Sequence, residues 1–365
     1  MLEEGRTTNG IICIEMEEVE SAKMANMAWF NAVLIVALHV MNFARPADAA
    51  SWWLRSVVHG GVCSMAVPFF FLASGWFLGR HVDEPGWWLR ELKKRVRTIL
   101  VPYGIFAAAS LVLVVGYDSF SALMKGASAR AALPTVGGLV DALGLNPFVL
   151  PGHDVLWFLR TLMLLVCVAP VFVAIIRRTG ILLPALAFLA SMVIQSVVYT
   201  ADPSPFASLM KNTLNDLGFT FFLLGLYLRM SGRSIVVPWR KAVGLLAVAA
   251  LLWTLRAFVL GEYLKGWSAI FTNPIALCLI FGFVGLAPTV KMPGTWTSFA
   301  IFMLHSYVIM ALKLETSLPS AYTCGYYIGV IAIAVVLPMG IAWVLNEYAK
   351  PLASVLFGGR VGRIR

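Results

Sequence analysis

Ten apolar segments, each about as long as a helix that crosses a bilayer, follow one another along nearly the whole chain. Hydrophobic residues make up 60% of the 365 residues and charged residues only 13%, against roughly 25% in ordinary soluble domains. A soluble core of this size could not cover so much apolar surface. The sequence therefore predicts an all-α, polytopic integral membrane bundle of about ten transmembrane helices. The predicted spans lie at residues 25–43, 60–79, 99–117, 155–176, 181–199, 216–230, 242–260, 268–288, 296–313 and 324–346.

Lysine and arginine are distributed unevenly between the two sides of the predicted bundle. With the N-terminus inside, 19 of the 28 fall in cytoplasmic segments and 8 in outer ones, and this bias predicts that both termini are cytoplasmic. We expect an acidic N-terminal tail over 1–24, which lacks the basic start of a signal peptide, one membrane domain over 25–348, and a basic tail over 349–365. The net charge of +10 then indicates topology and contact with anionic lipid, not a nucleic-acid partner.

One histidine, His39, lies in the outer part of the first predicted span. An imidazole is costly to bury in hydrocarbon unless its nitrogens have partners. Neither HxxxH nor HxxE spacing accompanies it, and the five cysteines are scattered singly, so the sequence predicts no metal site. Two interpretations stay open, a hydrogen bond in helix packing and a general base oriented by a neighbour.

A basic run stands where the third predicted span begins. Lys93, Lys94, Arg95 and Arg97 lie within ELKKRVRTILVPY, and the common role of such a run is anchoring at the inner leaflet. The alternative is an anion site, because guanidinium groups bind phosphate with two parallel hydrogen bonds. The preceding FFFLASGWFLGR contains Ser74, next to a glycine, which would allow close helix approach or a local break.

The outer loop over about 118–154 is long and rich in glycine and proline, which is unusual without a binding or lid role, although a disordered insert is an alternative. It ends in PGHDVLWFL, where Trp157 could belong to an interfacial aromatic belt. Ionisable residues inside the membrane indicate function. Arg160 lies one turn into the fourth span, and His305 lies in the middle of the ninth.

Five segments in order resemble the membrane acyltransferase-3 family, ten-span bacterial enzymes that modify cell-envelope glycans. The resemblance extends over nearly the entire chain and rests on the order and spacing of the segments. The family pattern has an arginine eleven positions before its first-span histidine, where this chain has Ala28. The segments are VLIVALH at Val33–His39, VPFFFLASGWFL at Val67–Leu78, LKKRVRTILVPY at Leu92–Tyr103, HDVLWFL at His153–Leu159 and FAIFMLHSYVI at Phe299–Ile309.

The resemblance implies O-acyl transfer from an acyl-coenzyme A, usually acetyl-coenzyme A, to a hydroxyl of a glycan or similar acceptor at the bacterial cytoplasmic (inner) membrane. His39 would be the general base, with no metal. The residues expected to contact the donor are Lys94, Arg95, Arg97, Tyr103 and Ser74. Those expected to contact the acceptor are His153, Asp154, Trp157, Arg160 and His305.

A transporter or flippase of a lipid-linked sugar or small anion is the alternative function. The same arginines would then bind a phosphate head group, and His39 would relay protons. An inverted sequence repeat would favour this function, and inspection of the sequence finds none.

Overall fold

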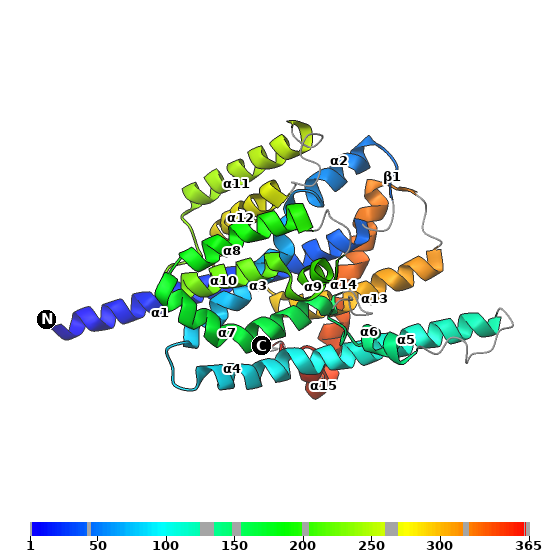
Figure 1. Ribbon diagram of the computed structural model, residues 1–365, viewed down its shortest axis with the longest axis horizontal. Helices are drawn as coiled ribbons and strands as arrows, with labels where there is room; N and C mark the ends of the chain where they lie inside the picture. The colour runs from blue at the N-terminus through cyan, green and yellow to red at the C-terminus, as the bar shows by residue number, and fades with distance from the viewer. Residues whose placement is uncertain are drawn as a thin grey trace.

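The computed structural model describes residues 2–41, 45–124, 135–147, 155–198, 204–259, 269–316, 321–360 and 362. Helices account for nearly all of this part of the chain (Figure 1). In chain order the long and short α-helices are α1 (Leu2–Met41), α2 (Ala49–Val58), α3 (Ala66–Leu78), α4 (Trp87–Arg95), α5 (Val101–Met124), α6 (Val136–Ala142), α7 (Leu156–Thr179), α8 (Leu182–Val193), α9 (Pro205–Leu209), α10 (Asp216–Met230), α11 (Trp239–Thr254), α12 (Ala269–Leu286), α13 (Ser298–Thr316), α14 (Cys324–Tyr348) and α15 (Lys350–Leu356).

Short turns of tighter or wider helix extend several of these elements. The 3₁₀ turns are η1 (Val62–Met65), η2 (Gly79–His81) and η8 (Thr295–Thr297). The π-helical turns are η3 (Val96–Leu100), η5 (Ile194–Val198), η6 (Met210–Leu214) and η7 (Leu255–Val259). Two two-residue strands, β1 (Arg45–Pro46) and β2 (Ala321–Tyr322), pair in parallel and join the segments beside α1 and α14.

Seven helical segments in the described part of the chain are long and apolar enough to cross a bilayer, which confirms the all-α membrane architecture. Each contains or overlaps a predicted span. The other three predicted spans coincide with the shorter helices α8, α10 and α12. The seven segments are Glu17–Val40, Ala49–His81, Trp87–Leu113, Leu156–Thr179, Trp239–Val259, Thr295–Leu312 and Cys324–Tyr348.

Helix α3 packs very closely against α10, because each presents a glycine at the contact. A methyl group added at Gly75 would overlap the carbonyl oxygen of Phe222, and one added at Gly225 would overlap that of Leu72. The small residues in LASGWF therefore allow close helix approach, one of the two predicted roles, and α3 continues unbroken through Gly75.

Helix α1 runs through the middle of the bundle (Figure 1) and contacts α3, α12, α13 and α14. Its buried polar side chains bind backbone oxygens of other segments, as expected where no water is available. The ammonium of Lys23 lies 2.7 Å from the carbonyl oxygen of Gly285 at the end of α12. The amide of Asn26 donates to the carbonyl oxygens of Pro288 and Val290 at 3.0 and 2.9 Å. These bonds fix the position of α1, and with it the position of His39.

Candidate active site

A cavity of about 440 Å³ lies between α1, α3, α4, α7, α13 and the C-terminal tail. Its basic side chains lie at one end, together with Phe77 and Phe299, and further phenylalanine rings line the other end. Arg80, at the end of α3 and η2, is ten residues from Phe70 on the same helical segment, or roughly 15 Å at the rise of an α-helix. The cavity therefore extends from a helix end into the interior of the bundle. Its basic lining residues are Arg80, His81, Lys94, Arg95 and Arg360, and its aromatic ones are Phe69, Phe70, Phe77, Phe158, Phe299 and Phe302.

Two guanidinium groups at the cationic end have buried nitrogens without hydrogen-bond partners among the described residues. They are Nε and Nη2 of Arg80 and Nε of Arg95. Arg80 stacks on Trp76 and Phe77, 4.6 and 5.0 Å from the ring centroids. The Nε of Arg95 lies 3.7 Å from a carboxylate oxygen of Glu91, too far for a hydrogen bond. Buried donors of this kind are uncommon in proteins and indicate a place for an anion or for water.

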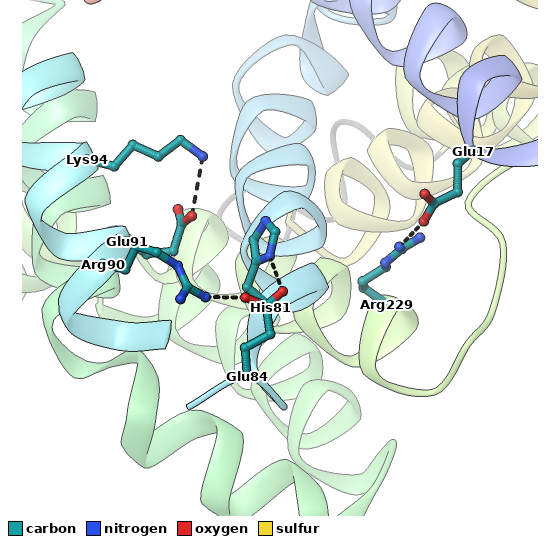
Figure 2. A network of polar contacts seen from close by, with 7 residues as sticks. All are labelled: Glu17, His81, Glu84, Arg90, Glu91, Lys94 and Arg229. Atoms are coloured by element: carbon teal, nitrogen blue, oxygen red, sulfur yellow. Dashed lines mark hydrogen bonds and ion pairs between the residues drawn. The ribbon is translucent and has the colours of Figure 1, made fainter. Parts of the chain in front are cut away.

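Several hydrogen-bonded and ion-paired side chains lie around the basic end of the cavity (Figure 2). Glu84 accepts a hydrogen bond from His81 at 2.8 Å and pairs with Arg90, and these two interactions lower the pKa of the Glu84 carboxyl below its usual value. Glu91 pairs with Lys94 at 3.3 Å, and Glu17 of α1 pairs with Arg229 of α10. These carboxylates are thus paired with neighbouring basic residues. Arg80 and Arg95 still have buried N–H groups without an acceptor among the described residues.

Three phenylalanines from three helices pack together at the inner end of the cavity. Phe158 of α7 lies between Phe70 of α3, at a centroid distance of 6.0 Å, and Phe302 of α13, at 5.4 Å. Phe70 and Phe302 also contact each other at 6.3 Å. We call these three residues the phenylalanine partition. Phe302 in turn contacts the ring of His305, one turn further along α13, at 6.3 Å, so the partition is adjacent to an imidazole.

His39 and His305 are in contact beside this partition. Their ring centroids are 5.0 Å apart and the ring planes meet at 64°. His305 is fully buried, and its Nδ1 lies 2.9 Å from the carbonyl oxygen of Ile301. A carbonyl can only accept, so the hydrogen bond assigns the proton of neutral His305 to Nδ1 and leaves Nε2 as the acceptor. The structure thus joins two histidines from opposite ends of the sequence.

Comparison with protein families decides what kind of protein carries this arrangement. A family model described as an acyltransferase domain matches residues 29–344, most of the chain. The chain belongs to the acyltransferase-3 family. The match begins just after Ala28 and ends before Arg360, so part of the cavity lining lies outside the matched region. No curated protein and no solved structure matches the chain significantly.

Three of the five residues expected to contact the acyl donor of this acyltransferase line the cavity, namely Ser74, Lys94 and Arg95. Arg97 is exposed and Tyr103 donates to the carbonyl oxygen of Leu143 at 2.8 Å, and neither of these two lines the cavity. Within the described residues, no group of three or more metal-ligating side chains is present.

The expected acceptor residues occupy different environments. His305 contacts His39, and Trp157 contacts Phe71 at a ring distance of 6.3 Å. Arg160 donates to the carbonyl oxygens of Gly144, Asn146 and Asn212, at 2.9, 3.0 and 2.5 Å, and so joins the segment after α6 to η6. His153 and Asp154 lie outside the described residues.

Ala28, at the position of the family's arginine, lines the cavity with a methyl group. Lys23, the nearest upstream base, is buried and bound to the end of α12, and it does not line the cavity. The sequence reasoning did not select Arg80, Arg360 or the phenylalanine partition. Arg80 is the last residue of FFFLASGWFLGR, and a basic residue directly after an apolar run is a signal that could have identified it. For Arg360 no local pattern exists.

Proposed function

We propose that this acyltransferase moves an acyl group, most often acetyl, from acyl-coenzyme A to a hydroxyl of a bacterial cell-envelope glycan. The observation that carries the proposal is the cavity itself. It has guanidinium donors without partners at one end and the phenylalanine partition, next to the histidine pair, at the other. We further propose ten spans in the cytoplasmic membrane with both termini inside, which turns the cationic end toward the cytoplasmic donor.

The cationic end suits the phosphate groups of coenzyme A. Guanidinium groups form short, charge-assisted hydrogen bonds to phosphate, often in pairs. Arg80 and Arg95 would bind phosphate oxygens through the buried nitrogens that otherwise lack partners, and Lys94 would add a cation. Ser74 lines the cavity between this end and the partition, so it would contact the extended arm of the donor.

His39 is the proposed general base. The acceptor hydroxyl is a poor nucleophile near neutral pH, and an imidazole can take its proton as the oxygen attacks the thioester carbonyl. The new oxygen–carbon bond forms, the carbon–sulfur bond breaks, and the proton passes from His39 to the departing coenzyme A sulfur. The adjacent ring of His305, fixed by Ile301, would orient His39.

The donor and the acceptor reach the histidine pair from opposite sides in this proposal. The thioester must pass the phenylalanine partition, so the three rings have to separate when the donor binds. On the outer side, His153, Asp154 and Trp157 are the proposed contacts for the glycan, with Trp157 stacking on a sugar face. Arg160 would act by holding the outer loop in place through its three carbonyl bonds.

The proposal is tested with purified protein in lipid nanodiscs, acetyl-coenzyme A labelled in the acetyl group, and envelope glycan. We expect label in the glycan together with an equal amount of free coenzyme A. A protein that binds no coenzyme A but exchanges a lipid-linked sugar across vesicles would refute acyl transfer and support the transporter alternative. The same assay with acetyl-, butyryl- and octanoyl-coenzyme A identifies the acyl group.

A further inference from the structure

The C-terminal tail folds back onto the cationic end of the cavity. After α15, Gly358 and Gly359 both have positive φ, at 60° and 76°, which reverses the chain at a position where other residues would be strained. Gly358 lies directly against the carbonyl oxygen of Thr98, which follows Arg97 in η3. Beyond the turn, the carbonyl oxygen of Gly362 accepts a hydrogen bond from buried Asn346 at 3.3 Å. The tail is therefore docked on the bundle.

This docking places Arg360 in the cavity lining. Its guanidinium carbon lies 4.2 Å from the ring centroid of Phe299, a cation–π contact. Its Nη1 is 3.3 Å from the carbonyl oxygen of Thr98, a long hydrogen bond. Burial, followed by the nearby charge of Arg95, lowers the pKa of Arg360 to about 10, so the group remains charged at neutral pH. Arg95 and Arg360 thus line the same cavity as like charges in a partly desolvated place.

Such an arrangement costs free energy that an anion would recover. Among the described residues, the carboxylate paired with Arg95 is that of Glu91, and it is shared with Lys94. A polyanion that enters the cavity would relieve the repulsion between Arg95 and Arg360 and would satisfy the buried nitrogens of Arg80 and Arg95. Among the described residues, helix α1 lines the cavity with the neutral Ser21, Met24, Ala25 and Ala28, and its acidic residues near Arg80, Glu17 and Glu20, are bonded to Arg229 and Ser234.

We propose that Arg360 is a third donor-binding guanidinium and that the C-terminal tail is part of the donor site, although it lies beyond the region that the family model matches. The inference rests on the proposed function, because it takes the phosphate groups of coenzyme A as the ligand. It predicts that donor affinity depends on a residue outside the acyltransferase domain, and on the turn that positions it.

The test is equilibrium binding of coenzyme A to the full-length protein in nanodiscs. Arg360→Gln is expected to raise the dissociation constant about tenfold or more, the effect of losing a hydrogen bond to a charged group. Arg360→Lys keeps the charge without the planar fork and should give an intermediate value. Gly358→Ala leaves the Arg360 side chain chemically unaltered, but its methyl group would overlap the Thr98 carbonyl oxygen, so it should displace the tail and weaken binding as well. Arg233→Gln is the matched control, because Arg233 is exposed and does not line the cavity.

The outcomes separate the inference from the function on which it rests. If Arg360→Gln binds coenzyme A as the parent protein does while Arg95→Gln loses binding, the inference is overturned and the donor site stands. If the parent protein binds no coenzyme A, the proposed function fails and the inference with it. Should Arg360→Gln not fold by size-exclusion chromatography, Arg360→Lys and Gly358→Ala decide, and parent-like affinity in both overturns the role of the tail.

Discussion

The imidazole rings of His39 and His305 lie in contact, 5.0 Å apart between centroids, across the packing of α1 against α13. His305 is held from behind by the backbone of its own helix, through the 2.9 Å contact with Ile301. The pair therefore consists of one histidine that is fully buried and fixed and one, His39, that is only half-buried. This asymmetry is consistent with the proposed roles, in which His39 is the base and His305 positions it.

Replacement of His305 tests the positioning role. We expect His305→Asn and His305→Phe to lower kcat by about tenfold or more, a part of the 10²–10⁴-fold that a general base contributes. The acidic limb of the kcat pH profile should also shift, which loss of packing alone would not produce. The affinity for coenzyme A should stay unchanged, because His305 does not line the cavity. An unaltered kcat and pH profile in both variants would contradict the assignment.

Arg95 and Arg97 provide a matched pair two residues apart in one helical segment. The side chain of Arg95 is only 13% exposed and lines the cavity, whereas Arg97 is exposed and does not. Arg95→Gln should raise the dissociation constant for coenzyme A about tenfold or more, and Arg97→Gln should change it less than about twofold, as a typical surface charge does. Equal effects of the two substitutions would indicate a general electrostatic attraction and would contradict a specific phosphate-binding site.

Phe302 links the phenylalanine partition to His305, so it should limit the acyl group that reaches the histidines. Phe302→Ala removes a ring from the inner end of the cavity. We expect the kcat/KM ratio of octanoyl- to acetyl-coenzyme A to rise about tenfold or more, since each buried methylene contributes about 1 kcal/mol. Phe77→Ala is the control, because Phe77 lies beside Arg80 at the cationic end and its loss should leave the ratio unchanged. A ratio that moves equally in both variants would refute a selective partition.

The glycine contact between α3 and α10 predicts a stability effect that has no connection with the site. Gly75→Ala and Gly225→Ala would each force a methyl group onto a backbone carbonyl, and overpacking of this kind costs typically about 1–3 kcal/mol. Gly244→Ala, in α11, meets nothing within 4 Å and should be neutral or stabilising. Thermal unfolding in detergent, followed by fluorescence, measures all three. A melting temperature for Gly75→Ala equal to that of Gly244→Ala would contradict the close approach.

The helices were predictable from sequence because apolar runs of the required length have few alternatives in a bilayer. Each predicted span overlaps a helix in the described part of the chain, and the acyltransferase family was recognised from ordered segments. The number of membrane-spanning helices is harder to determine. Helices such as α10, with 15 residues, are shorter than the roughly 20 residues that cross a bilayer.

The site was predictable residue by residue but not as an arrangement. His39 and His305 stood out separately as intramembrane histidines, yet their contact depends on how α1 packs against α13, which no local pattern encodes. Arg95 and Arg97 have equivalent sequence contexts, and only the rotation of the helix separates a cavity position from an exposed one. Arg360 reaches the cavity through a glycine turn and a docked tail, which are products of tertiary structure.

In the proposed mechanism the arginines bind the donor and His39 acts as the base. The dependence of the transfer rate on acetyl-coenzyme A concentration tests this separation of roles most directly. In nanodiscs with a fixed acceptor, His39→Ala should bind acetyl-coenzyme A as the parent does and lose about 10²–10⁴-fold in kcat. Arg95→Gln should require about tenfold more donor but approach the parental rate at saturation. Transfer that survives in His39→Ala, or donor binding that is unchanged in Arg95→Gln, would contradict the account.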